Sequence, residues 1–325
     1  MKTKGTHKML WGLIYVITFV VVFAVSVLLK LTIDPSGGKY SVEWSDAIGT
    51  VHTDLVYGEK DANKFDLYLP ADNSRDTYGL VVYLHPGGFT SGDKSGDAEM
   101  MQWLCSKGYV GASINYTLRD EAHPEASVYS QSMEIKESMP FVIAEAEKLG
   151  YKINEMSIGG GSAGHCLAML YAYRDAADAP VPVRMVFGAV GPSSFYPEDW
   201  KCYGLDKDTE ESKAGAAELF GVMAGKKITS DMFGTPEYDE AVKDISALLW
   251  VDENTVPSLM AYGKHDRIQP YEASIRLDAA LTKYGVPHDY IVMEHSGHGL
   301  QNDYKQYALY MEKMEEYLDI YMPVK

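Results

Sequence analysis

The chain has 325 residues, 46% of them hydrophobic, which is enough to bury one large core. Its 46 acidic residues outnumber the 29 basic ones, and the formal net charge of -17 argues against a nucleic-acid partner or a basic face that binds anionic lipid. The three cysteines form no CxxC pair and no cysteine and histidine cluster at zinc-site spacing. Neither a disulfide framework nor a structural metal is therefore expected.

An apolar run without a charged side chain extends from Met9 to Leu29. As a helix it rises ~30 Å, which matches the hydrocarbon core of a bilayer. We therefore predict a transmembrane anchor over residues 9–32, after a cytoplasmic N-terminus over 1–8 that carries three lysines. A cleaved signal peptide and a buried core helix are the alternatives, but the run is long for a signal peptide and no small-x-small cleavage site follows it. The rest of the chain would lie outside the cytoplasm, joined to the anchor by a polar tether over 33–45.

Residues 46–325 alternate short β-rich runs with longer helical patterns. This alternation is typical of a mostly parallel sheet with helices on both faces, so the sequence predicts one α/β domain. The segment 192–249 is an exception, because it has helix-like pieces and no clear strand. It is a candidate small cap over the carboxyl ends of the strands, with a solvated excursion as the alternative. The expected strands are 65–69, 79–85, 109–115, 155–160, 184–190, 256–262 and 289–293.

The sequence Gly160-Gly161-Ser162-Ala163-Gly164 fits G-x-S-x-G, a sharp strand-to-helix turn that presents a serine hydroxyl above a sheet. A strand is expected before this turn and a helix after it, as the motif requires. The Ala163 N–H would then lie at the positive end of a helix, where an oxyanion could bind. Tight packing of a strand against a helix is the alternative reason for these glycines.

A Gly-rich turn, HPGGF, follows the expected strand 79–85 and matches the HGGG-type loop that supplies oxyanion donors. Pro86 stands in the place of the first glycine and has no N–H, so the donors would be the amides of Gly87 and Gly88.

An acid and a base for the serine follow later in the chain. Asp266 comes just after the strand 256–262, and His298 lies between two glycines after the strand 289–293. The order Ser162, Asp266, His298 is the one expected for a hydrolase with this serine turn. His295 competes with His298 for the role of base, but it lies closer to the strand end and lacks the flanking glycines.

Taken in order, these motifs resemble those of α/β-hydrolases, and more narrowly the serine esterase and lipase group with hormone-sensitive-lipase-like and feruloyl-esterase-like (BD-FAE) members. The resemblance runs from KFDLYLP (64–70) to GHGL (297–300). Pro86 and His165 depart from it, since glycine is commoner at both positions. The resemblance implies these roles: Ser162 as nucleophile, His298 as base and then acid, Asp266 as its orienter, and the amides of Gly87, Gly88 and Ala163 as oxyanion hole.

The function that we expect is a carboxylesterase for short acyl esters, with acetyl esters of carbohydrates as one candidate class. It would act on a small-molecule ester without a cofactor or a metal, while the oligomeric state stays open. Two alternatives share the same scaffold: a serine peptidase related to prolyl oligopeptidases, and a surface-displayed binding protein with an inactive site. The chain has no room for a propeller domain, and all three triad roles have an intact candidate.

Overall fold

The computed structural model describes residues 3–32 and 38–324. The chain divides into two compact units, and the boundary between them falls between Tyr40 and Ser41 in the sequence. The first unit is the helix α1 (Thr3–Thr32), on which large apolar side chains such as Trp11 and Phe19 are exposed. The predicted membrane anchor is not supported: within the described parts of the chain, none of the helices is both long enough and apolar enough to cross a membrane. Residues 33–37 of the predicted tether lie outside the described residues.

The second unit is built on an eight-stranded sheet in the order β1-β2-β4-β3-β5-β6-β7-β8. Only the two pairings that involve β2 are antiparallel, and the five others are parallel. The mostly parallel α/β-hydrolase-like architecture predicted from the sequence is therefore present. The strands are β1 (Gly49–Val56), β2 (Lys64–Pro70), β3 (Tyr78–Leu84), β4 (Val110–Ile114), β5 (Ile153–Gly161), β6 (Val183–Ala189), β7 (Ser258–Gly263) and β8 (His288–Met293).

All seven predicted strands are found, each within a few residues of its expected bounds, but the edge strand β1 was not predicted. Strands such as β3 and β4 are buried on both faces, so their sequences are nearly continuous apolar runs. In β1 most residues are exposed, and a register shift between His52 and Leu55 interrupts the alternation of side chains. An exposed strand with a bulge leaves little hydrophobic pattern to detect.

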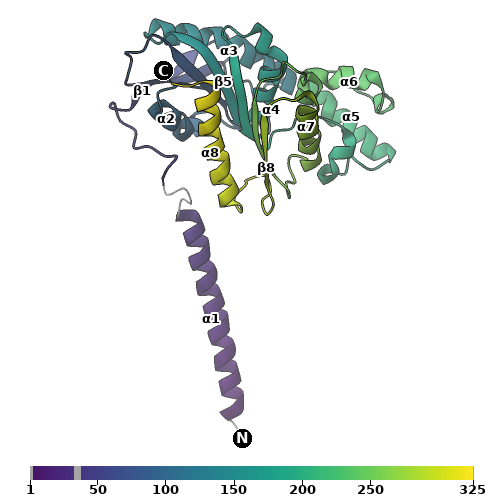
Figure 1. Cartoon of the computed structure of the whole chain (residues 1–325). Helices are drawn as coiled ribbons and strands as arrows, with labels where there is room; N and C mark the ends of the chain where they lie inside the picture. The colour runs from purple at the N-terminus through teal and green to yellow at the C-terminus, as the bar shows by residue number, and fades with distance from the viewer. Residues whose placement is uncertain (1–2, 33–37, 325) are drawn as a thin grey trace. The chain divides into compact units, whose positions relative to one another are not determined.

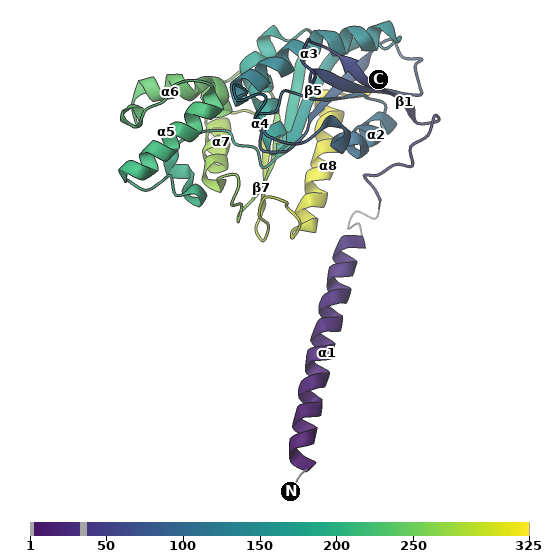
Figure 2. The same cartoon turned by 180° about the vertical axis from the view of Figure 1, so that it is seen from behind.

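Helices cover both faces of the sheet (Figures 1 and 2). α2 packs on β4 and β2, α8 on β7 and β8, and α4 on β5. Two further helices, α5 and α6, gather on the side of the domain that is opposite β1. The α-helices of this unit are α2 (Ala98–Ser106), α3 (Val128–Lys148), α4 (Ala163–Leu170), α5 (Glu210–Ala224), α6 (Pro236–Val242), α7 (Tyr271–Tyr284) and α8 (Tyr304–Tyr321).

The segment 192–249 has no strand and consists of α5, α6 and short 3-10 turns, as its sequence predicted. We call it the insert, because it leaves the sheet after β6 and the chain returns in β7, the direct neighbour of β6. It contacts the loop after β7 through the Tyr203 hydroxyl, which donates to the Ile268 carbonyl at 3.1 Å. The insert thus flanks the loop that carries Asp266.

Candidate active site

Ser162 occupies a tight turn between β5 and α4, near the middle of the sheet. Its φ of 50° and ψ of -117° are unusual for a residue with a side chain. The Ser162 N–H donates to the Ala189 carbonyl on β6 at 2.8 Å, which ties the turn to the neighbouring strand. Strain of this kind persists only where the surroundings impose it, and it is common where a nucleophile is presented.

The glycines around the serine are required by close backbone contacts. A Cβ at Gly164 would lie 1.9 Å from the Leu84 carbonyl oxygen, and one at Gly160 would lie 2.4 Å from the Gly164 carbonyl carbon. A Cβ at Gly161 would meet nothing closer than 3.8 Å. The close approach of strand and helix, one of the two reasons considered for these glycines, therefore applies to the first and last glycines of the motif.

The structure brings together the three side chains that the sequence put forward. His298 Nε2 lies 2.9 Å from Ser162 Oγ, and its Nδ1 lies 2.7 Å from Asp266 Oδ2. With the carboxylate as acceptor, Nδ1 carries the proton and Nε2 accepts from the serine hydroxyl. These contacts form one continuous hydrogen-bond chain from the serine to the carboxylate.

Asp266 is fixed by its own loop. Its side chain is 1% exposed, and Oδ1 accepts from the backbone N–H groups of Ile268 at 2.8 Å and Gln269 at 2.9 Å. Those bonds leave Oδ2 for His298. A carboxylate held in this way can orient the imidazole ring and stabilise it when it is positively charged.

The HPGGF loop follows β3 and contains three consecutive residues in the left-handed region, with φ values of 140° at Gly87, 60° at Gly88 and 68° at Phe89. The loop is held at its first residue, His85. The ring of Tyr116 stacks on the His85 ring with 4.3 Å between ring centres, and the Tyr116 hydroxyl donates to the His85 carbonyl at 2.9 Å. Among the described residues, the amides of Gly87, Gly88 and Ala163 donate to no other protein group. They are therefore free to bind a ligand oxygen.

Residues 65–281, two thirds of the chain, match the BD-FAE family. The chain belongs to the BD-FAE family. This match agrees with the α/β-hydrolase fold that the sequence motifs indicated.

Solved structures with the same fold include two esterases. One is esterase B from Lactobacillus rhamnosis, which is 18% identical, with a TM-score of 0.62 and 93% of each chain covered. The other is a carbohydrate esterase from gut microbiota, also 18% identical with a TM-score of 0.62, covering 84% of this chain and 98% of that one. A curated relative, kynurenine formamidase from Danio rerio, is 29% identical over 139 residues, 42% of this chain. The alignment spans less than half of that relative, 44% of its length.

His165, where this BD-FAE sequence departs from the commoner glycine, is a buried neutral residue behind the serine turn. Its Nδ1 accepts from the Gly191 N–H at 3.1 Å, and its ring packs 5.9 Å from that of Tyr262. Burial lowers the pKa of His165 to about 3, against a smaller opposing effect of the Ala189 carbonyl. The ring fills space beside Gly188, where an added Cβ would lie 2.3 Å from His165 Cδ2. His165 therefore acts locally, by packing against Tyr262 and by accepting one backbone hydrogen bond.

His295 does not join the hydrogen-bond chain. Its Nδ1 lies 2.8 Å from Asp303 Oδ1, and 79% of its side chain is exposed. Of the two competing histidines, it is His298 that reaches the serine. Nothing in the sequence marks Asp303 as a partner of this loop, because a carboxylate just before a helix is typical of an ordinary helix start.

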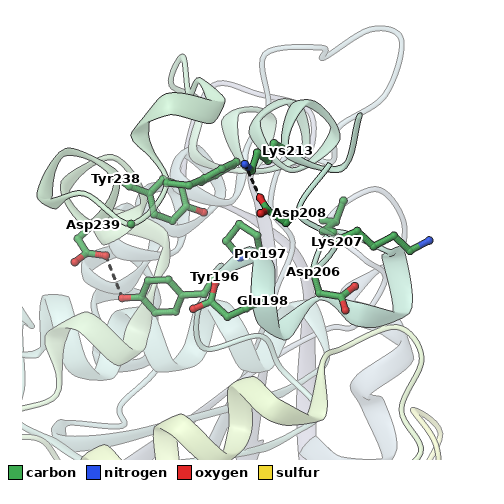
Figure 3. A pocket seen from close by; sticks show the side chains of 12 residues that line it. Tyr196, Pro197, Glu198, Asp206, Lys207, Asp208, Lys213, Tyr238 and Asp239 are labelled. Atoms are coloured by element: carbon green, nitrogen blue, oxygen red, sulfur yellow. Dashed lines mark hydrogen bonds and ion pairs between the residues drawn. The ribbon is translucent and has the colours of Figure 1, made fainter. Parts of the chain in front are cut away.

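The insert has a concave surface of its own, a pocket of about 360 Å³ that is drawn in Figure 3. The rings of Tyr196 and Tyr238 line one side, and the Tyr196 hydroxyl donates to Asp239 at 3.2 Å. Asp208 and Lys213 form an ion pair of 2.6 Å on the other side. Ser162, Asp266 and His298 are not among the residues that line this pocket.

Proposed function

We propose that the protein is a serine carboxylesterase that hydrolyses short acyl esters through an acyl-enzyme. The observation that carries this proposal is the hydrogen-bond chain from Ser162 through His298 to Asp266, 2.9 Å and 2.7 Å long at its two steps, beside backbone amides that no protein group uses. A nucleophile, a base in hydrogen-bond reach and a third group that orients the base are what acyl transfer requires.

In the first half-reaction, Ser162 Oγ attacks the ester carbonyl while His298 Nε2 takes its proton. The resulting tetrahedral oxyanion is bound by the amides of Gly88 and Ala163, with Gly87 as a further donor. His298 then gives the proton to the departing alcohol oxygen, and the acyl group remains on Ser162. In the second half-reaction, His298 activates a water molecule that releases the acid and restores the serine.

The substrate class that we favour is an acetyl or similarly short acyl ester of a carbohydrate. Membership of the BD-FAE family and the likeness in fold to a carbohydrate esterase support this choice. A panel of nitrophenyl esters from acetyl to long-chain acyl, together with acetylated and feruloylated sugars, would test it. We expect the highest kcat/KM on acetylated sugars, and a maximum on long-chain esters would refute this part of the proposal.

The decisive experiment compares Ser162→Ala and His298→Ala with the wild-type protein on nitrophenyl acetate. Each substitution should lower kcat on the order of 10⁴-fold or more, because members of a triad act as a unit. A fluorophosphonate probe should label the wild-type protein and not Ser162→Ala. Equal turnover by Ser162→Ala would refute the assignment, and absence of labelling in a folded wild-type sample would favour an inactive binding protein.

Amide hydrolysis is a second candidate, since a kynurenine formamidase is among the relatives. The same serine, base and oxyanion donors can cleave an amide when the histidine protonates the leaving nitrogen. N-formylkynurenine and aminoacyl nitroanilides belong in the same panel. Turnover of either without ester turnover would replace the esterase proposal with a formamidase or a peptidase.

Localisation is a separate proposal that rests on the sequence alone. The uncharged run from Met9 to Leu29 and the lysines before it support a single-pass attachment with the hydrolase domain outside the cytoplasm. Alkaline carbonate extraction of membranes, followed by protease treatment of intact cells, would test it. Recovery of the full-length chain in the carbonate supernatant would refute it.

A further inference from the structure

The loop between β8 and α8, residues 294–303, is closed on itself by one buried carboxylate. Asp303 is 4% exposed, and its Oδ2 accepts from the His295 N–H at 2.9 Å and from the Ser296 hydroxyl at 2.6 Å. Its Oδ1 faces His295 Nδ1 at 2.8 Å. All three contacts join the last residue of the loop to the two residues near its beginning.

Asn302 adds a second pair of bonds across the same closure. Its N–H donates to Ser296 Oγ at 3.0 Å, and its side-chain amide donates to the His295 carbonyl at 2.9 Å. Between the two ends lie Gly297 and Gly299, which have no side chains that could orient the loop. How the ends are closed is therefore one of the constraints on where His298 lies, beside its own bonds to Asp266 and Ser162.

The closure also fixes the loop against the loop that carries Asp266. The His265 N–H donates to the Ser296 carbonyl at 2.9 Å. Gly263 and Gly297 are so close that a Cβ at Gly263 would lie 2.2 Å from the Gly297 carbonyl oxygen. Ser296 thus binds Asp303 with its side chain and the acid-bearing loop with its backbone.

The charge of Asp303 strengthens this closure. Burial by itself raises the pKa of the carboxyl group, but the hydrogen bonds from Ser296 and His295 outweigh it and hold the pKa below its usual value. Asp303 is then ionised throughout the neutral range. Hydrogen bonds to an ionised acceptor are roughly twice as strong as neutral ones.

We propose that Asp303 is a positioning residue for His298, acting by closing the 294–303 loop so that the imidazole ring meets both Ser162 and Asp266. This inference rests on the proposed function, since it gives Asp303 a role only if His298 is the base. Asp303 does not contact the serine or the substrate. Its contribution is the placement of a ring whose catalytic value falls steeply when it is displaced by about 1 Å.

The test compares Asp303→Asn, Asp303→Ala and Ser296→Ala with Asp319→Asn, a control on the exposed side of α8. With nitrophenyl acetate, the Asp303 variants should lose ~10- to 100-fold in kcat while KM stays within about twofold. Fluorophosphonate labelling of Ser162 should slow by a similar factor. Asp303→Asn should retain more activity than Asp303→Ala, because the amide oxygen still accepts one bond.

A merely structural role predicts a different pattern. It would lower the melting temperature and the yield of folded protein, but kcat per folded molecule would not change. Our proposal predicts a lower kcat per folded molecule with a nearly unchanged KM, and partial recovery in Asp303→Asn relative to Asp303→Ala.

Wild-type labelling rates and a wild-type kcat per folded molecule in Asp303→Asn would overturn the inference. If Asp303→Ala does not fold, Asp303→Asn and Ser296→Ala decide the question. Failure of the proposed function looks different, because Ser162→Ala would then keep full turnover whatever the Asp303 variants do.

Discussion

The serine turn and the histidine loop are held in place by opposite means. Around Ser162, backbone meets backbone so closely that Gly160 and Gly164 leave no room for a methyl group. The loop of His298 is held by side-chain hydrogen bonds that converge on Asp303. The turn is therefore sensitive to added atoms, and the loop is sensitive to the loss of polar ones. Ser162 is thus positioned by steric exclusion around its turn, and His298 is positioned by hydrogen bonds that its loop makes to a charged carboxylate.

The largest effect should come from adding one methyl group to the serine turn. In Gly164→Ala the new Cβ would lie 1.9 Å from the Leu84 carbonyl oxygen, so β3 and α4 must separate. We expect a loss of more than ~3 kcal/mol in the free energy of unfolding, measured by urea denaturation. Gly161→Ala is the matched control, because its Cβ meets nothing within 3.8 Å and should change stability by less than about 1 kcal/mol. Equal losses in the two variants would contradict the steric account.

The serine turn should also respond to acid through His165. Its pKa is about 3 in the folded protein and about 6.5 in an unfolded chain, so the unfolded state binds the extra proton first as the pH falls. The stabilising contribution is complete above pH ~6.5 and is lost as the pH falls toward ~3, by about 2–3 kcal/mol at pH ~4.5. The free energy of unfolding should be measured with urea at pH ~6.5 and at pH ~4.5. Its loss between these two pH values should be smaller in His165→Asn than in the wild type, because asparagine keeps an acceptor for the Gly191 N–H. An unchanged difference would place the acid sensitivity elsewhere.

The histidine loop can be displaced from the neighbouring strand. In Gly263→Ala the added Cβ would lie 2.2 Å from the Gly297 carbonyl oxygen and would push the loop away from Asp266. We expect kcat on nitrophenyl acetate to fall ~10- to 100-fold. Gly96→Ala is the control, because a Cβ there meets nothing within 4 Å. Full activity in Gly263→Ala would mean that the loop tolerates displacement better than the geometry suggests.

The smallest effect should come from His295, the histidine that competed with His298 in the sequence. His295→Ala removes the bond from Nδ1 but keeps the backbone N–H bond to Asp303. We expect a loss of at most about threefold in kcat, compared with on the order of 10⁴-fold or more for His298→Ala. Similar losses in the two variants would show that the imidazole ring of His295 is needed to keep the loop closed.

Steric constraints leave a trace in the amino-acid sequence, whereas the polar closure of the histidine loop does not. Buried parallel strands and Gly-rich turns leave marks in the sequence, so seven strands and the positions of Ser162, Asp266 and His298 at strand ends could be predicted. The strand β1 could not, because its residues are mostly exposed. Asp303 could not either, since nothing local in the sequence says that its carboxylate folds back onto residues seven and eight positions earlier.

The stack of Tyr116 on His85 was equally hidden. These residues lie 31 positions apart in the chain, and their contact depends on the parallel pairing of β3 with β4, which brings the ends of the two strands together.

The position of the insert has a consequence for how such a protein can diversify. Because β6 and β7 pair directly, from Val186 with Ser258 to Ala189 with Ala261, the sheet is complete without the residues between them. The insert still packs on the domain through buried side chains such as Phe195, Phe220 and Tyr238, so its freedom to vary lies at its exposed positions. Over evolutionary time, exposed positions of the insert can change the surface beside the Asp266 loop while the serine turn and the histidine loop keep their register.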